Sequence, residues 1–320
     1  MRILRRIQRT LPTTNQPLPS ADVGVVYILI SGIAFGLLPW FSRIAFDHGV
    51  EPIGLLTIRF LGAMTCLVLF HLLIRRNVAW PSRKMFGKLI ILGAIGYAPQ
   101  SMLFASGVER IDISLATIIF YTYPIMVVLL SWLVLKQIPS RAVVVSLMTA
   151  VVGAAMTAGQ IKAGSWTGVT LMFIAATWYA VSIIVVDRVL KDVDAFMSVT
   201  GIMVGASLAN VVAWFFTRAT LPSDVQGWSA AFAAAIISTI VALGFLIIGI
   251  QRIGPGQASV LSTIEPVVSI SVGVIALNES ITAVRILGAI LVVIGVAMMA
   301  QAAREKEAVV PQPETHSPFE

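Results

Sequence analysis

The chain has 320 residues, a formal net charge of +7 and an apolar composition, with 58% hydrophobic and 12% charged residues. Soluble domains carry about 25% charged residues, so this composition excludes an ordinary soluble protein. Apolar runs of about 20 residues can cross a bilayer as helices, and the basic residues lie between such runs. We therefore assign the positive charge to membrane topology rather than to nucleic-acid binding, and expect an all-α integral membrane protein in contact with lipid.

Ten apolar segments follow a basic N-terminal tail, which we assign to residues 1–22. The predicted spans are 23–46, 53–74, 86–107, 113–135, 141–160, 166–187, 195–217, 229–250, 256–277 and 284–303. Residues 304–320 are charged and contain proline, which predicts a disordered tail. No apolar core with a cleavage site precedes Val23, so we expect no cleaved signal peptide.

An internal repeat organises the chain. Residues 107–156 match residues 249–298 without a gap, at a constant offset of 142 positions (249 minus 107). The matched pairs include Gly107 with Gly249, Arg110 with Arg252, Pro124 with Pro266, and Gly153 with Gly295. Each half holds five spans, an odd number, so the repeats at 23–160 and 166–303 must enter the membrane from opposite sides. Such inverted repeats are typical of secondary transporters, because one fold then provides two mirror-like conformations.

The distribution of basic residues predicts the orientation. With the N-terminus in the cytoplasm, the outer side receives only six of the 22 Lys and Arg residues, and the other 16 lie on the inner side. The outer six are Arg43, Arg59, Arg110, Lys162, Arg218 and Arg285. Basic residues accumulate in cytoplasmic loops, so we expect both termini to be cytoplasmic.

Five short segments, two in the first repeat and three in the second, resemble the EamA-type members of the drug/metabolite transporter superfamily. They are residues 105–111 and 121–124, and residues 252–259, 264–268 and 277–279. The resemblance covers about residues 23–303, and Arg59 fits a position that is commonly basic. Gln137 departs from it, because the first repeat often carries an acidic residue there. The resemblance implies a multi-pass carrier of the inner (plasma) membrane, most often an exporter of amino acids, related metabolites or drugs. It also implies a cavity between the first, third, fourth, sixth, eighth and ninth helices.

Glu265 is the most unusual residue, because it lies near the middle of the ninth span, directly before Pro266. A carboxylate at that depth costs about 2.5–3.5 kcal/mol unless it is paired, protonated or hydrated. It indicates a proton-coupling or substrate-amine site, or else a hydrogen bond between helices. Pro124 is the equivalent proline in the fourth span, where Tyr123 replaces the carboxylate. We expect Tyr123 and Glu265 to face each other across the pseudo-twofold axis, and the two prolines to let their helices bend.

Further site candidates come from polar and aromatic residues within spans. Arg59 could recognise a substrate carboxylate or gate the outer side, but we favour the interpretation that it snorkels to the headgroups. The amide of Gln100 must find a partner in a neighbouring helix. Aromatic residues could stack on a flat substrate or hold a cation, although each could also be ordinary packing. They are Trp40, Tyr97, Phe104, Phe120, Tyr121, Tyr123, Trp132, Trp178 and Tyr179, of which Trp178 and Tyr179 lie mid-span.

The sequence favours a secondary active transporter that moves a small molecule by alternating access, with protons as the simplest coupling ion. A channel or facilitator without ion coupling and, more remotely, an intramembrane enzyme are the alternatives. No P-loop or zinc-protease motif is present, and three histidines with one cysteine cannot build an ordinary transition-metal site, so we expect no cofactor and no metal. Small residues on the fifth and tenth spans suit either packing within the bundle or a dimer, which leaves a monomer or a homodimer open.

Overall fold

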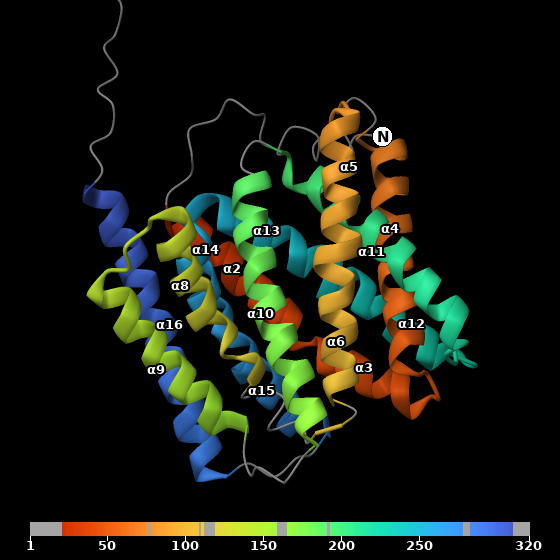
Figure 1. Cartoon of the computed structure of the whole chain (residues 1–320). Coiled ribbons are helices and arrows are strands. Elements are labelled where there is room, and N and C mark those ends of the chain that lie inside the picture. Colours follow the sequence, from red (N-terminus) through yellow and green to blue (C-terminus); the bar gives the residue numbers. More distant parts are fainter. Residues whose placement is uncertain are drawn as a thin grey trace, which may run out of the picture.

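The computed structural model of the protein describes residues 21–75, 78–108, 110–111, 119–158, 165–190, 193–277 and 282–309, and these form a bundle of helices without a strand (Figure 1). The first half contains α2 (Ala21–Gly36), α3 (Leu38–Asp47), α4 (Pro52–Leu73), α5 (Arg83–Ile91), η1 (Leu92–Tyr97), α6 (Ala98–Val108), α8 (Tyr123–Leu135) and α9 (Arg141–Ala158). The second half contains α10 (Trp166–Val189), α11 (Ala195–Thr217), α12 (Val225–Ala235), η2 (Ile236–Val241), α13 (Ala242–Ile253), α14 (Pro255–Leu261), η3 (Ser262–Ile264), α15 (Glu265–Leu277) and α16 (Ala283–Val309).

All ten predicted spans fall on helices, which confirms the all-α membrane fold; the fourth is described from Ile119 onward. Seven helices of the described chain are each long and apolar enough to cross a bilayer on their own. The predicted disordered tail is wrong for residues 304–309, because α16 continues to Val309. Arg, Lys, Glu and Ala dominate this stretch, and all four favour a helix. The N-terminal tail through residue 20, the seam at 159–164 and residues 310–320 lie outside the described residues.

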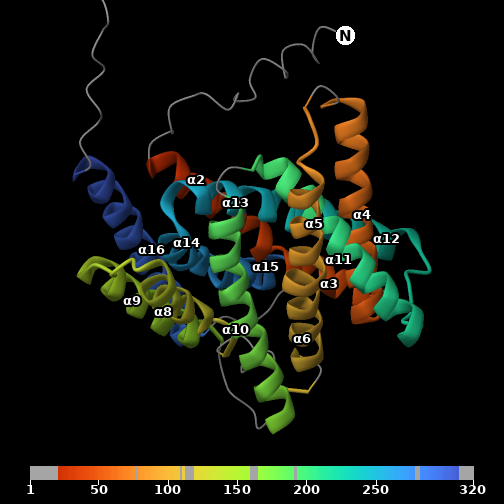
Figure 2. The same cartoon turned by 45° about the horizontal axis from the view of Figure 1, so that its top comes forward.

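The two halves run in opposite directions. α2 begins and α16 ends toward the same side of the bundle, at the top of Figure 1, and we call this side the terminal face. α2 runs away from the terminal face, whereas α10, its counterpart in the second half, runs toward it (Figure 1). The turned view of Figure 2 preserves this relation. The repeats are therefore inverted, as the odd number of spans requires.

Helix packing repeats the same symmetry at atomic detail. A Cβ atom on Gly153 in α9 would lie 2.7 Å from the carbonyl oxygen of Gly288 in α16. A Cβ atom on Gly295 in α16 would lie 2.8 Å from the carbonyl oxygen of Ser146 in α9. Both pairs are related by the offset of 142, so the two helices make one contact twice. The small-residue faces of the fifth and tenth spans are thus used within this chain.

Local irregularities also occur in equivalent pairs. The π-helices η1 and η2 occupy matching positions in the third and eighth spans, and α8 and α15 begin at the matched residues Tyr123 and Glu265. In each of these two α-helices proline is the second residue, where its missing N–H leaves no helical bond unmade. The ninth span consequently passes from α14 through the short 3₁₀ segment η3 into α15 at mid-depth. The first span is also divided, at Leu37, with Pro39 in the first turn of α3.

Hydrogen bonds hold α4 and α11 together at both ends. On the terminal face, Arg75 forms an ion pair of 3.2 Å with Asp194, which caps the N-terminus of α11. On the opposite face, the Glu51 carboxylate accepts hydrogen bonds from the backbone and the side chain of Thr220. This antiparallel pair is fastened on either side of the bundle, so we regard it as a scaffold on which the other helices are arranged.

Candidate substrate and coupling site

The Glu265 carboxylate lies where the ninth span changes from η3 to α15. Its Oε2 atom accepts a hydrogen bond of 3.2 Å from the Tyr121 hydroxyl. Among the described residues, the ion pairs of the structure involve other carboxylates, so no Lys, Arg or His side chain neutralises this one. A Cβ atom on Gly32 of α2 would lie 2.4 Å from Ile264 Cγ2 and 3.8 Å from Glu265 Cγ, so the first span packs directly on the break.

Five aromatic rings extend from this carboxylate through the middle of the bundle. They are Phe104, Phe120, Tyr121, Tyr123 and Tyr179, which we call the aromatic cluster. Phe120 is its centre, with ring centroids 5.0 Å from Phe104, 5.5 Å from Tyr123 and 5.6 Å from Tyr179. The rings of Tyr123 and Tyr179 meet edge to face at 4.8 Å, and Tyr121 lies 6.2 Å from Tyr123. These are the separations at which aromatic pairs attract each other.

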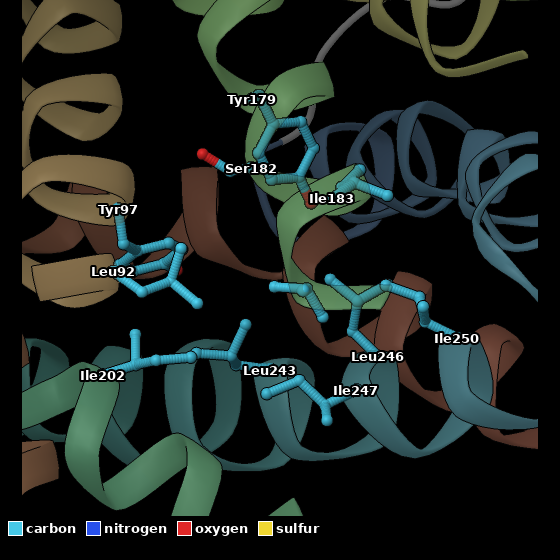
Figure 3. Close-up of a pocket in the computed structure, with 11 residues that line it drawn as sticks. Leu92, Tyr97, Tyr179, Ser182, Ile183, Ile202, Leu243, Leu246, Ile247 and Ile250 are labelled. Carbon is cyan, nitrogen blue, oxygen red and sulfur yellow. The ribbon is translucent and has the colours of Figure 1, made fainter. Parts of the chain in front are cut away.

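A small pocket adjoins the aromatic cluster and lies toward the terminal face. Tyr179 belongs to both, and Tyr97 and Tyr179 stand on facing walls above the aliphatic side chains of α13 (Figure 3). The lining consists of Leu92, Tyr97, Tyr179, Ser182, Ile183, Val186, Ile202, Leu243, Leu246, Ile247 and Ile250. Apart from Ser182, Tyr97 and Tyr179, every lining side chain is aliphatic. Of the six spans that the resemblance implied, the third, sixth and eighth line this pocket. The described residues of the first, fourth and ninth do not, and the seventh contributes Ile202 in addition.

Arg59 does not snorkel to a surface, and that prediction is wrong. Arg59 is only 5% exposed. Its Nη2 donates to the Tyr97 hydroxyl at 3.3 Å, and its guanidinium carbon lies 4.6 Å from the Phe60 ring centroid. The side chain turns inward because Tyr97 offers an acceptor and Phe60 offers a ring face. Arg59 therefore supports the Tyr97 wall of the pocket from behind.

The remaining predicted residues take different places. Tyr123 is fully buried in the aromatic cluster, but the residue that hydrogen-bonds to Glu265 is Tyr121. Sequence reasoning counted Tyr121 among the cavity aromatics without assigning it to the carboxylate. Trp178 is 38% exposed and stands outside the pocket lining, where its indole N–H donates to the Ile95 carbonyl in η1 at 2.9 Å. Gln100 is buried in α6, one turn beyond Tyr97.

Comparisons with known proteins agree with this geometry. The sequence profile of the EamA-like transporter family matches residues 22–159 and 166–301, one match for each repeat. The chain therefore belongs to the EamA-like transporter family and is a multi-pass membrane transporter.

Two relatives come from Bacillus subtilis (strain 168). Uncharacterized transporter YyaM is 25% identical over 225 residues, which cover 67% of this chain and 73% of the relative. Uncharacterized transporter YcbK is 20% identical over 289 residues, 84% of this chain and 89% of the relative. A solved structure described as "Crystal structure of protein" superposes with a TM-score of 0.75 at 18% identity, covering 89% of this chain and 98% of the other. This last likeness concerns the fold alone.

Proposed function

We propose that this transporter moves a small organic molecule across the inner (plasma) membrane by alternating access, as a secondary carrier driven by protons. One observation supports this more than any other. A carboxylate without a cationic partner among the described residues lies at a helix break, and the aromatic cluster connects it to a pocket between two inverted repeats. Ionisable groups at this depth are expensive and usually mark an ion or substrate pathway. The resemblance to exporters makes outward transport the expected direction.

Differences between the two repeats support alternating access. The Ser31 hydroxyl donates to the Ala242 carbonyl at 2.8 Å, and the Ser238 hydroxyl donates to the Ala34 carbonyl at 2.6 Å. These bonds join the first and eighth spans. The π-helices η1 and η2 begin 144 positions apart (236 minus 92), and at this offset the equivalents of Ser31 and Ala242 are Ala175 and Ala98. Ala175 has no hydroxyl to donate. The pocket lies between the third span of the first repeat and the sixth, seventh and eighth spans of the second, and exchanging the conformations of the two repeats would move it across the membrane.

A gradient experiment separates this carrier from the alternative facilitator. Purified protein is reconstituted into liposomes, and uptake of radiolabelled amines and amino acids is followed with and without an imposed pH gradient. A coupled carrier should accumulate its substrate above the equilibrium level, because one proton moving down a gradient of one pH unit supplies about 1.4 kcal/mol, or roughly a tenfold gradient. A protonophore should remove the accumulation. Flux that only equilibrates, at the same rate with or without the gradient, would identify a facilitator or channel.

The orientation has its own test. With Cys66 replaced by alanine, single cysteines are placed at the exposed positions Gln137, on the terminal face, and Ser223, on the opposite face. A membrane-impermeant maleimide added to intact cells should label Ser223→Cys and leave Gln137→Cys unlabelled until the cells are opened. Labelling of Gln137→Cys alone in intact cells would reverse the proposed topology. Equal labelling of both would show that they share a face, and would contradict the fold as well.

A further inference from the structure

The chemistry around Glu265 requires a positive charge from outside the described part of the chain. One hydrogen bond, from the Tyr121 hydroxyl, satisfies part of one carboxylate oxygen. A carboxylate has about four acceptor positions, and an ionised one in an apolar bundle is costly unless it is paired. The described residues offer no Lys, Arg or His side chain in an ion pair with it. A proton or a cationic ligand is therefore needed whenever the site is away from water.

The aromatic cluster offers the same positive charge a second kind of partner. Ring faces attract ammonium groups within about 6 Å of their centroids. Tyr121 joins the carboxylate to the cluster, and Phe120 and Tyr179 lie nearly parallel, 25° apart, at 5.6 Å. An ammonium group at Glu265 would thus lie next to Tyr121, whose ring is 6.1 Å from that of Phe120. A proton bound to the carboxylate would not interact with these ring faces.

The lining of the adjoining pocket indicates the chemistry of the rest of such a ligand. Its lining between Tyr179 and Ile250 is aliphatic apart from Ser182 and the tyrosine hydroxyls. This lining suits an apolar or flat aromatic body and offers nothing to a strongly hydrated one. A carboxylate entering here would lose its water without gaining a cation from the lining.

Arg59 does not supply that cation from within the pocket. Its Nη2 atom donates to the hydroxyl of Tyr97, and Tyr97 is the residue that lines the pocket. The guanidinium lies over Phe60, outside the aromatic cluster, so the Tyr97 side chain stands between it and the ligand space. The two buried charges are consequently not presented together to one small zwitterion.

From these four observations we infer that the site binds organic amines with one positive charge, a flat or apolar body and no carboxylate, in preference to amino acids. This inference rests on the proposed transport function and specifies its substrate class. It names Glu265 as the partner of the ammonium group, and Phe120 and Tyr179 as the rings that contact the ligand.

A matched series of ligands tests the inference by binding, without requiring transport. All three ligands of the series share one phenyl body. Phenethylamine carries an amine, hydrocinnamate carries a carboxylate, and phenylalanine carries both groups. Binding to the purified protein in nanodiscs is measured by calorimetry. We expect phenethylamine to bind at least about tenfold more tightly than phenylalanine, with no detectable binding of hydrocinnamate, because tenfold corresponds to 1.4 kcal/mol and an unpaired buried charge costs more.

Variants connect the binding to the named residues. Glu265→Gln should weaken phenethylamine at least about tenfold, since the ammonium loses its charged partner. Tyr179→Leu should weaken phenethylamine severalfold, and Phe86→Leu, which changes a ring outside the aromatic cluster and the pocket, should not. Circular dichroism and thermal unfolding confirm that each variant is folded.

Each outcome has one meaning. Phenylalanine binding as tightly as phenethylamine would overturn the inference in favour of a zwitterion, and so would phenethylamine binding that folded Glu265→Gln leaves unchanged. Gradient-driven transport of amino acids without amine binding would leave the carrier intact and overturn the substrate class. Tight amine binding without any gradient-driven flux would support the site and contradict the proposed transport.

Discussion

Replacing Glu265 with glutamine is expected to abolish accumulation driven by a pH gradient while the protein still folds. Glutamine has nearly the same shape, and its amide oxygen can accept the hydrogen bond that Tyr121 donates over 3.2 Å. It cannot exchange a proton or carry a negative charge, so a cycle coupled through this side chain should stop. The measurement is uptake into proteoliposomes across a range of external pH, with thermal unfolding as the check on folding. An unchanged rate and pH profile in the variant would show that coupling occurs elsewhere.

The two tyrosines near Glu265 provide matched controls for that experiment. Tyr121→Phe removes the tyrosine donor to the carboxylate but keeps the charge, so transport should remain coupled and its pH profile should shift. A hydrogen bond to a charged group contributes about 1.5–3 kcal/mol, which sets the upper limit of the shift. Tyr123→Phe removes a buried hydroxyl that makes no hydrogen bond to the carboxylate, so it should leave the pH profile unchanged. A larger effect at Tyr123 than at Tyr121 would restore the pairing that the sequence predicted.

The fold was largely predictable because membrane insertion imposes a strong pattern. Runs of about 20 apolar residues identify helices regardless of their partners, and an odd number of spans per repeat requires inversion. Pro124 and Pro266, where the sequence predicted that the fourth and ninth spans bend, are the second residues of α8 and α15, because proline has little place in a helix beyond its first turn. These features depend on short stretches of sequence or on the number of spans, so they can be predicted from a single sequence.

The positions of the π-helices and the hydrogen-bond partners of the buried side chains could not be predicted from the sequence. η1 and η2 differ from α-helix only in which carbonyl each N–H reaches, and their composition is that of any apolar helix. The gapless repeat begins at Gly107, after η1, so the internal match does not mark them. Arg59 was expected to snorkel because burial of a charge is costly, but its acceptor, Tyr97, lies 38 residues away in another span. Likewise, only the turn before α8 decides that Tyr121 rather than Tyr123 reaches Glu265.

Alanine at Gly205 or Gly93 is expected to destabilise the protein strongly, because the added methyl group would collide with the backbone of a neighbouring helix. A Cβ atom on Gly205 in α11 would lie 1.9 Å from the carbonyl oxygen of Ile90, and one on Gly93 in η1 would lie 1.9 Å from that of Ile202. These obstacles are backbone atoms, so no side-chain rotation relieves them. Either the helices separate or η1 shifts, and overpacking of this kind costs about 1–3 kcal/mol or more.

Gly87 in α5 is the matched control, because a Cβ atom there would meet nothing within 4 Å. Gly87→Ala should leave thermal unfolding unchanged or raise the midpoint slightly, since alanine favours a helix over glycine by about 1 kcal/mol. The three variants are compared in one detergent by tryptophan fluorescence during heating. Because Leu92 and Tyr97 of η1 line the pocket, Gly205→Ala should also weaken ligand binding in any fraction that remains folded. Equal unfolding midpoints for Gly205→Ala and Gly87→Ala would mean that α11 and the third span pack less closely than described, and that the pocket wall depends on other contacts.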